Sequence, residues 1–125
     1  MTTSKEFVLG VVLSLAAVVP PATAHHSFAM FDQTKILNAD GVTVREFHWG
    51  NPHSFVVVDV KDANGITPYT LECNSINLMS RAGWTFNTIK NGDKVNIVYY
   101  PLRDGRPGGM LKTITLSDGK TLKAW

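Results

Sequence analysis

The sequence predicts an all-β domain with one short helix, built as a small five-stranded barrel in the order β-β-β-α-β-β. Three observations predict it. Five segments carry the β-branched and aromatic residues typical of strands. Asn, Asp, Gly and Pro residues that favour turns separate these segments. The one helical pattern lies between the third and fourth segments, which is the element order of the OB-fold. Another small five- or six-stranded barrel or sandwich is the alternative, because spacing alone does not fix the order of strands in space.

The five predicted strands cover residues 36–49, 54–60, 67–73, 94–100 and 110–116. The first is interrupted near Asp40 and Gly41, where we expect a bulge or bend. The second is apolar on both faces, as in the middle of a sheet. The turn DANG, residues 62–65, should reverse the chain because Asn and Gly accept positive φ angles. After the fifth strand, the turn SDGK leads to a short tail.

The predicted helix has the sequence NSINLMSRAG. Asn74 or Ser75 is the expected N-cap, and Gly83 is the expected stop. The side chains expected on its inner face are those of Ile76, Met79 and Ala82.

The N-terminus has the pattern of an export signal. Lys5 precedes the apolar run FVLGVVLSLAAVV, and Ala22 and Ala24 stand at the small-residue positions before a cleavage point. An uncleaved anchor is the weaker alternative, because spanning a bilayer takes about 20 apolar residues. We therefore expect a signal peptide over residues 1–24, a flexible leader over 25–34 and a single β-barrel domain over 35–125. The mature protein would be periplasmic or secreted, with no stable membrane insertion.

The charged residues and the single cysteine limit the classes of partner that we expect. Residues 25–125 contain 11 Lys or Arg and 9 Asp or Glu, interspersed, so nucleic acid is not an expected partner. The chain has a single cysteine, Cys73, and cannot form an internal disulfide. Cys73 alternates with Tyr69 and Leu71, which predicts a buried, inert thiol. A metal ligand or an intermolecular bridge is the alternative for Cys73.

The four histidines fall into two short segments, TAHHSF and HWGNPHSF. Cleavage after Ala24 would give His25 a free α-amine beside its imidazole, and nitrogen ligands of this kind suit Cu(II). His26, His48 and His53 are the further candidate ligands, with the last two close together if they pair across the turn. The sequence thus predicts a transition-metal site with copper preferred over zinc, which usually takes four protein ligands.

The histidines also have structural interpretations. His25 and His26 would then form a solvated tail. His53 would hydrogen-bond within its turn, and His48 would flank the packed Phe47 and Trp49. We expect the apolar residues of SFAMF to dock the leader onto the barrel.

A second functional hypothesis uses the usual ligand face of an OB-fold. Phe55, Tyr69, Tyr99 or Tyr100 would form an aromatic platform, closed over by Arg103 and Arg106. The ligand would be a saccharide, a peptide or a protein of the cell envelope. The alternative is that these aromatics fill the core and the arginines keep a loop soluble.

An enzyme is not expected. The sequence contains no recognisable catalytic triad, paired catalytic carboxylates, phosphate loop or haem attachment motif.

Several phrases of the chain resemble a family of small exported bacterial proteins of unknown function. They are HHSF after the signal, WGNPHSF, SRAGW, NGDKV, RDGRPGGM and LSDGKTL, spread over residues 25–122. The resemblance implies export and a compact β domain, and it implies no particular activity or catalytic residue.

Overall fold

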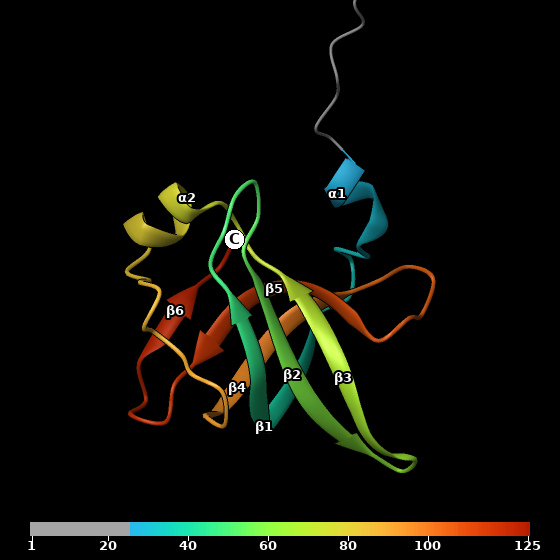
Figure 1. Cartoon of the computed structure of the whole chain (residues 1–125). Helices are drawn as coiled ribbons and strands as arrows, with labels where there is room; N and C mark the ends of the chain where they lie inside the picture. Colours follow the sequence, from blue (N-terminus) through green and yellow to red (C-terminus); the bar gives the residue numbers. More distant parts are fainter. Residues whose placement is uncertain (1–25) are drawn as a thin grey trace, which may run out of the picture.

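Six strands and two short helices make up residues 26–125, the part of the chain that the structure, a computed structural model, describes (Figure 1). In chain order they are α1 (His26–Met30), β1 (Leu37–His48), β2 (Phe55–Asp62), β3 (Gly65–Glu72), α2 (Ile76–Arg81), β4 (Lys94–Pro101), β5 (Gly108–Thr115) and β6 (Thr121–Lys123). The predicted signal peptide and His25 lie outside the described residues.

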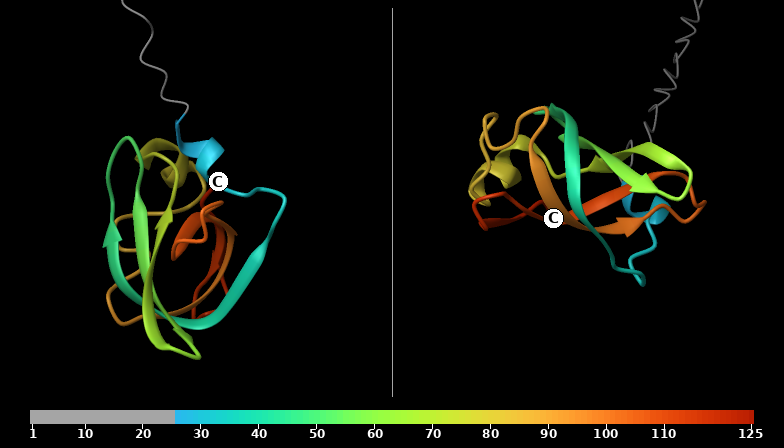
Figure 2. Two further views of the ribbon diagram at one scale, coloured as in Figure 1. Left: turned by 90° about the vertical axis from the view of Figure 1, so that its right-hand side faces the viewer. Right: turned by 90° about the horizontal axis from the view of Figure 1, so that it is seen from below.

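The strands form one sheet that closes on itself. Their order is β3-β2-β1-β4-β5-β6, and β3 also pairs with β5 in parallel, from Thr70 opposite Gly108 to Glu72 opposite Met110. Five strands thus form a closed barrel, and β6 extends the sheet beside β5 (Figure 2). The predicted all-β, OB-like barrel with its β-β-β-α-β-β core order is confirmed.

Two glycines allow the barrel to close. Gly108 has a φ of +132°, and a Cβ there would lie 2.5 Å from the carbonyl oxygen of Thr70 on β3. A Cβ on Gly109 would overlap the carbonyl oxygen of Tyr100 on β4. Because only glycine lets two backbones approach this closely, the pair Gly108-Gly109 brings β5 against β3 and β4 at once.

The core fills the inside of the barrel. Val56 and Val58, two alternate residues of β2, have no exposed surface, and β3 adds the equally buried Leu71. Met79 of α2 and the following Trp84 are each 1% exposed. The other core side chains include Val44, Ile97, Leu111 and Ile114. This alternation is the period of two expected for strands with one face in the core.

The irregular points of the first two strands agree with the sequence in part. The register of β1 against β4 shifts between Ala39 and Val42, which confirms the predicted bulge. At the 62–65 turn, Gly65 has a φ of +111°. Among the described residues only glycines have positive φ, so the expectation for Asn64 is wrong. Its amide instead donates to Oδ1 of Asp62, which holds the turn without a left-handed residue at that position.

Helix α2 has the predicted ends. Ser75 is the N-cap, and its Oγ accepts a hydrogen bond from the amide of Leu78. Gly83, with a φ of +95°, follows the last turn. The predicted inner face is only partly correct, because Met79 is buried whereas Ala82 is exposed. The helix lasts less than two turns and contacts the barrel mainly through that one side chain.

The residues predicted as a short tail form β6 and a packed end. Leu122 and Ala124 are 5% and 2% exposed, and their burial accounts for the pairing of Thr121–Lys123 with β5. The indole nitrogen of Trp84 donates to the carbonyl oxygen of Lys123 at 2.8 Å. The alternating apolar residues are too few for a strand to be predicted from them.

Residues 26–34, expected as a flexible leader, contain α1 and an extended stretch docked on the barrel. Phe31 is 2% exposed and bridges to Leu102. The amide of Asp32 donates to the carbonyl oxygen of Pro101 at 2.8 Å, and the amide of Arg103 donates to the carbonyl oxygen of Met30 at 2.9 Å. Burial of Phe31 and these backbone bonds hold the segment, as the apolar residues of SFAMF led us to expect.

Candidate functional site

The turn between β1 and β2 is held by its own polar side chains. Ser54 is fully buried, and its Oγ exchanges hydrogen bonds with the amide and carbonyl of Gly50 at 3.3 and 3.2 Å. Oδ1 of Asn51 accepts from the amide of Ile76 at the start of α2. The peptide bond between Asn51 and Pro52 is cis. Much of the sequence GNPHS is therefore explained by the architecture of the turn.

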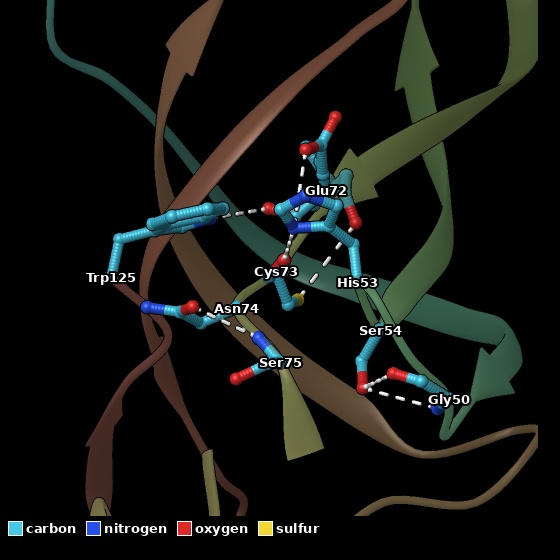
Figure 3. A network of polar contacts seen from close by, with 9 residues as sticks. Gly50, His53, Ser54, Glu72, Cys73, Asn74, Ser75 and Trp125 are labelled. Atoms are coloured by element: carbon cyan, nitrogen blue, oxygen red, sulfur yellow. Dashed lines mark hydrogen bonds and ion pairs between the residues drawn. The ribbon is translucent and has the colours of Figure 1, made fainter. Parts of the chain in front are cut away.

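His53 leaves this turn with one ring nitrogen already occupied. Its Nδ1 lies 3.2 Å from the carbonyl oxygen of Cys73 and 3.4 Å from Oε1 of Glu72 (Figure 3). The nearer acceptor is the carbonyl, so a proton on Nδ1 is directed toward Cys73. The side chain of His53 is 28% exposed. In this tautomer Nε2 carries the free lone pair, as in histidines that bind metals through Nε2.

Glu72 is the unusual charge next to His53, and sequence reasoning missed it. Leu71 and Cys73 on either side point into the core, so Glu72 points out of the barrel beside Phe55 of β2. Its Oε1 is buried and has no hydrogen-bond partner, and the side chain is only 16% exposed. Burial raises the pKa of the Glu72 carboxyl, and the neighbouring His53 lowers it by less. The signal in the sequence was the alternation of apolar and polar residues in YTLEC, which predicts that the side chain of Glu72 points out of the barrel.

Trp125 joins His53 to the N-terminal helix. The centroid of its ring lies 5.6 Å from that of His53 and 5.1 Å from that of Phe28, which is in α1. Its indole nitrogen donates to the carbonyl oxygen of Glu72 at 3.0 Å. Figure 2 shows α1 beside the C-terminal end of the chain. Phe28 of α1 and His53 thus pack against the same indole ring.

The four predicted histidine ligands have different positions. His48 is exposed and pairs with Phe55 in the β1–β2 register, not with His53. His25 lies outside the described residues, as does the side chain of His26. Within residues 28–125, no three side chains of His, Cys, Asp or Glu are grouped so that they could hold a metal ion.

The residues of the alternative binding face are separated by the structure. Phe55 and Arg106 line a common groove, whereas Tyr100 lies under the ammonium group of Lys112, 5.7 Å from the ring centroid. The Nε of Arg103 donates to the carbonyl oxygen of Ala29 and thus holds α1. Tyr69 and Tyr99 pack edge to face at 6.2 Å, as the core interpretation expected.

The groove lies where an OB-fold usually holds its ligand, against β2 and β3 and under the loop between β4 and β5. Its volume is about 430 Å³. Its lining is mainly apolar, with Glu72 and Arg106 as the charged residues among Met30, Phe31, Phe55, Pro68, Thr70, Leu102, Pro107 and Gly109. Arg106 is already paired, because its Nε lies 2.6 Å from Oδ2 of Asp104.

Cys73 should be chemically inert in the folded protein. Burial, reinforced by the nearby Glu72 carboxylate, raises the pKa of its thiol far above the ordinary value, and it has no exposed surface. A raised pKa lowers the fraction of thiolate, the form that reacts. We expect iodoacetamide at pH 7.5 to label Cys73 at least about a hundredfold more slowly than it labels the chain in denaturant. Equal rates, followed by mass spectrometry, would contradict this burial.

These features define a small closed OB-like barrel with a docked N-terminal helix and a groove on its ligand face. The chain belongs to a family of unknown function, DUF6152, whose model matches residues 12–112. No curated protein and no solved structure matched the chain. Among the described helices, none has the length and apolar character to cross a membrane.

Proposed function

We propose that the mature protein is exported to the periplasm or beyond and binds one transition-metal ion, preferably Cu(II), through His25 and His53. The supporting observation is the chain of ring contacts from Phe28 through Trp125 to His53. His25 stands three positions before Phe28, at most about 10 Å of chain, so the start of the mature chain would lie within reach of His53. The protein would act as a carrier or sensor of the metal for a partner in the cell envelope, not as a catalyst.

The ligand set follows from nitrogen chemistry. The α-amine and imidazole of His25 would chelate the ion, and Nε2 of His53 would complete a nitrogen-rich site suited to Cu(II). The Cys73 carbonyl would fix the ring of His53 from the other side, at its Nδ1. His26 and His48 are the remaining candidates for a further position. Cys73 is excluded as a ligand in the folded state because it is buried in the core.

A titration with Cu(II), followed by electron paramagnetic resonance, tests this proposal. Mature protein that starts at His25 should bind one equivalent with nitrogen couplings. His53→Ala should weaken binding at least about tenfold, the scale on which even the loss of outer partners of a metal ligand acts. His48→Ala is the comparison that decides whether the exposed histidine takes part.

The matched control is the same protein with an acetyl group on the α-amine of His25. Acetylation converts the amine beside the ring of His25 into an amide and leaves the barrel unchanged, so tight binding should be lost. Because imidazole and amine must lose protons to bind, affinity should also fall as the pH drops below about 6. Full affinity in the acetylated protein, or at pH 4, would refute ligation by the amine and the imidazoles.

The groove favours a second candidate function, an envelope binding module that needs no metal. In this module Phe55 and Arg106 would line the binding site, as the sequence predicted, whereas Tyr100 and Arg103 lie outside the groove.

A further inference from the structure

We propose that the groove between the β2–β3 face and the β4–β5 loop is a binding site for an ammonium group carried on an apolar chain. This inference does not rest on the binding of copper. It rests on the Glu72 carboxylate, on the apolar walls around it and on the pairing of the other charges nearby.

Among the described residues, no donor forms a hydrogen bond with the carboxylate of Glu72. Its Oε1 has no hydrogen bond, and its ion-pair partner at 3.4 Å, Nδ1 of His53, lies nearer to the carbonyl oxygen of Cys73. Figure 3 shows the second carboxylate oxygen directed away from His53. A carboxylate removed from water without a partner is costly, and a ligand that supplies charged N–H donors offsets this cost. The groove therefore favours a cation at this point.

The apolar lining of the groove favours a cation that is attached to an apolar group. Phe55 lies directly across the β2–β3 ladder from Glu72, so an ammonium group at the carboxylate lies near an aromatic ring. Met30 of α1 and Leu102 of the β4–β5 loop supply apolar surface. A fully hydrophilic cation would leave this surface uncovered, whereas an alkyl chain would cover it.

The positive charge at the groove does not oppose a cationic ligand strongly. The guanidinium group of Arg106 forms an ion pair with Asp104, and its side chain is 64% exposed, so solvent screens it. Among the described residues, no lysine or arginine pairs with Glu72, whose one ion-pair partner is Nδ1 of His53 at 3.4 Å. The volume of about 430 Å³ is within the range of small-ligand sites.

Titration of ¹⁵N-labelled mature protein with n-hexylammonium, monitored by amide chemical shifts, tests the site. We expect saturable shifts centred on Phe55, Thr70 and Gly109, and much weaker binding of hexanoate, which has the same chain and the opposite charge. Glu72→Gln should weaken hexylammonium binding about tenfold, the expected scale for the loss of one charged hydrogen bond.

Glu46→Gln is the matched control, because Glu46 is an exposed carboxylate of β1 outside the groove. It changes the net charge equally and should leave affinity unchanged. Equal binding of hexanoate, equal losses in the two variants, or no saturable shift would refute the site. Thermal unfolding of both variants checks that they fold.

Two further probes distinguish the source of the ammonium group. An N-acetylated, C-amidated Leu-Lys-Leu peptide represents a lysine of a protein, and cadaverine represents a free amine. Tighter binding of the peptide would assign the site to a polypeptide partner, and tighter binding of cadaverine would assign it to small amines. All titrations are run without added metal, so they are independent of the proposed copper site.

Discussion

Gly109→Ala should lower the free energy of unfolding by about 3 kcal/mol, the upper range for an overpacked site. The added Cβ would overlap the carbonyl oxygen of Tyr100 and approach a ring carbon of Tyr99 at 2.9 Å. Neither neighbour can move cheaply, because Tyr100 pairs with Met110 in the β4–β5 ladder and Tyr99 is in the core. The expected strain therefore falls on the strand that closes the barrel. Urea unfolding followed by circular dichroism measures the loss.

Gly50→Ala is the matched control for this effect. Neither Gly50 nor Gly109 has a positive φ, and a Cβ on Gly50 would also meet an atom at 2.5 Å. That atom is Nε2 of the exposed His48 side chain, which can rotate away. We expect Gly50→Ala to change stability by less than about 1 kcal/mol. Equal losses in the two variants would show that backbone contact at Gly109 is not the cause.

Trp84→Ala should cost about 3–5 kcal/mol, a large part of the stability of a domain of this size. Trp84 is 1% exposed, and its ring centroid lies 5.8 Å from that of Phe47. Its indole nitrogen also donates to the carbonyl oxygen of Lys123, which ties the segment after α2 to β6. The substitution would leave a cavity and an unpaired carbonyl group. Calorimetric unfolding of residues 25–125 measures the change.

Phe86→Ala, two residues further along the same connector, is the comparison for Trp84. Phe86 is 67% exposed, so its loss should change stability by no more than about 0.5 kcal/mol. Trp84→Phe keeps most of the ring and removes the hydrogen bond, and it should fall between the two. A loss below about 1 kcal/mol for Trp84→Ala would contradict the burial described above.

The five long strands were predictable because their patterns are local. Val56 and Val58 alternate into the core over a run long enough to recognise, and Gly83 stops the helix through its own conformation. The pairing of Leu122 with Ile114 was not predictable, because β6 has only three residues. Helix α1 was missed because a distant contact fixes it. Phe31, the residue after the helix, is held by Leu102, about 70 residues away.

The candidate site was predictable only in part. The histidine segments draw attention through their composition, but their proximity depends on Trp125, which contacts both His53 and Phe28 across the fold. No local pattern places the end of the sequence beside its first helix. Glu72 was missed because a single acidic residue in a strand usually faces water, and its burial depends on the segments packed around it.

The parallel pairing of β3 with β5 also bears on self-association. An unpaired strand edge is a template on which another chain can add a strand. Pairing of residues 70–72 with β5 leaves only the earlier part of β3 without a partner on that side. Pro68 lies in this part and has no N–H to offer an incoming strand. The closure that forms the barrel, together with this proline, thus protects β3 from edge-to-edge aggregation.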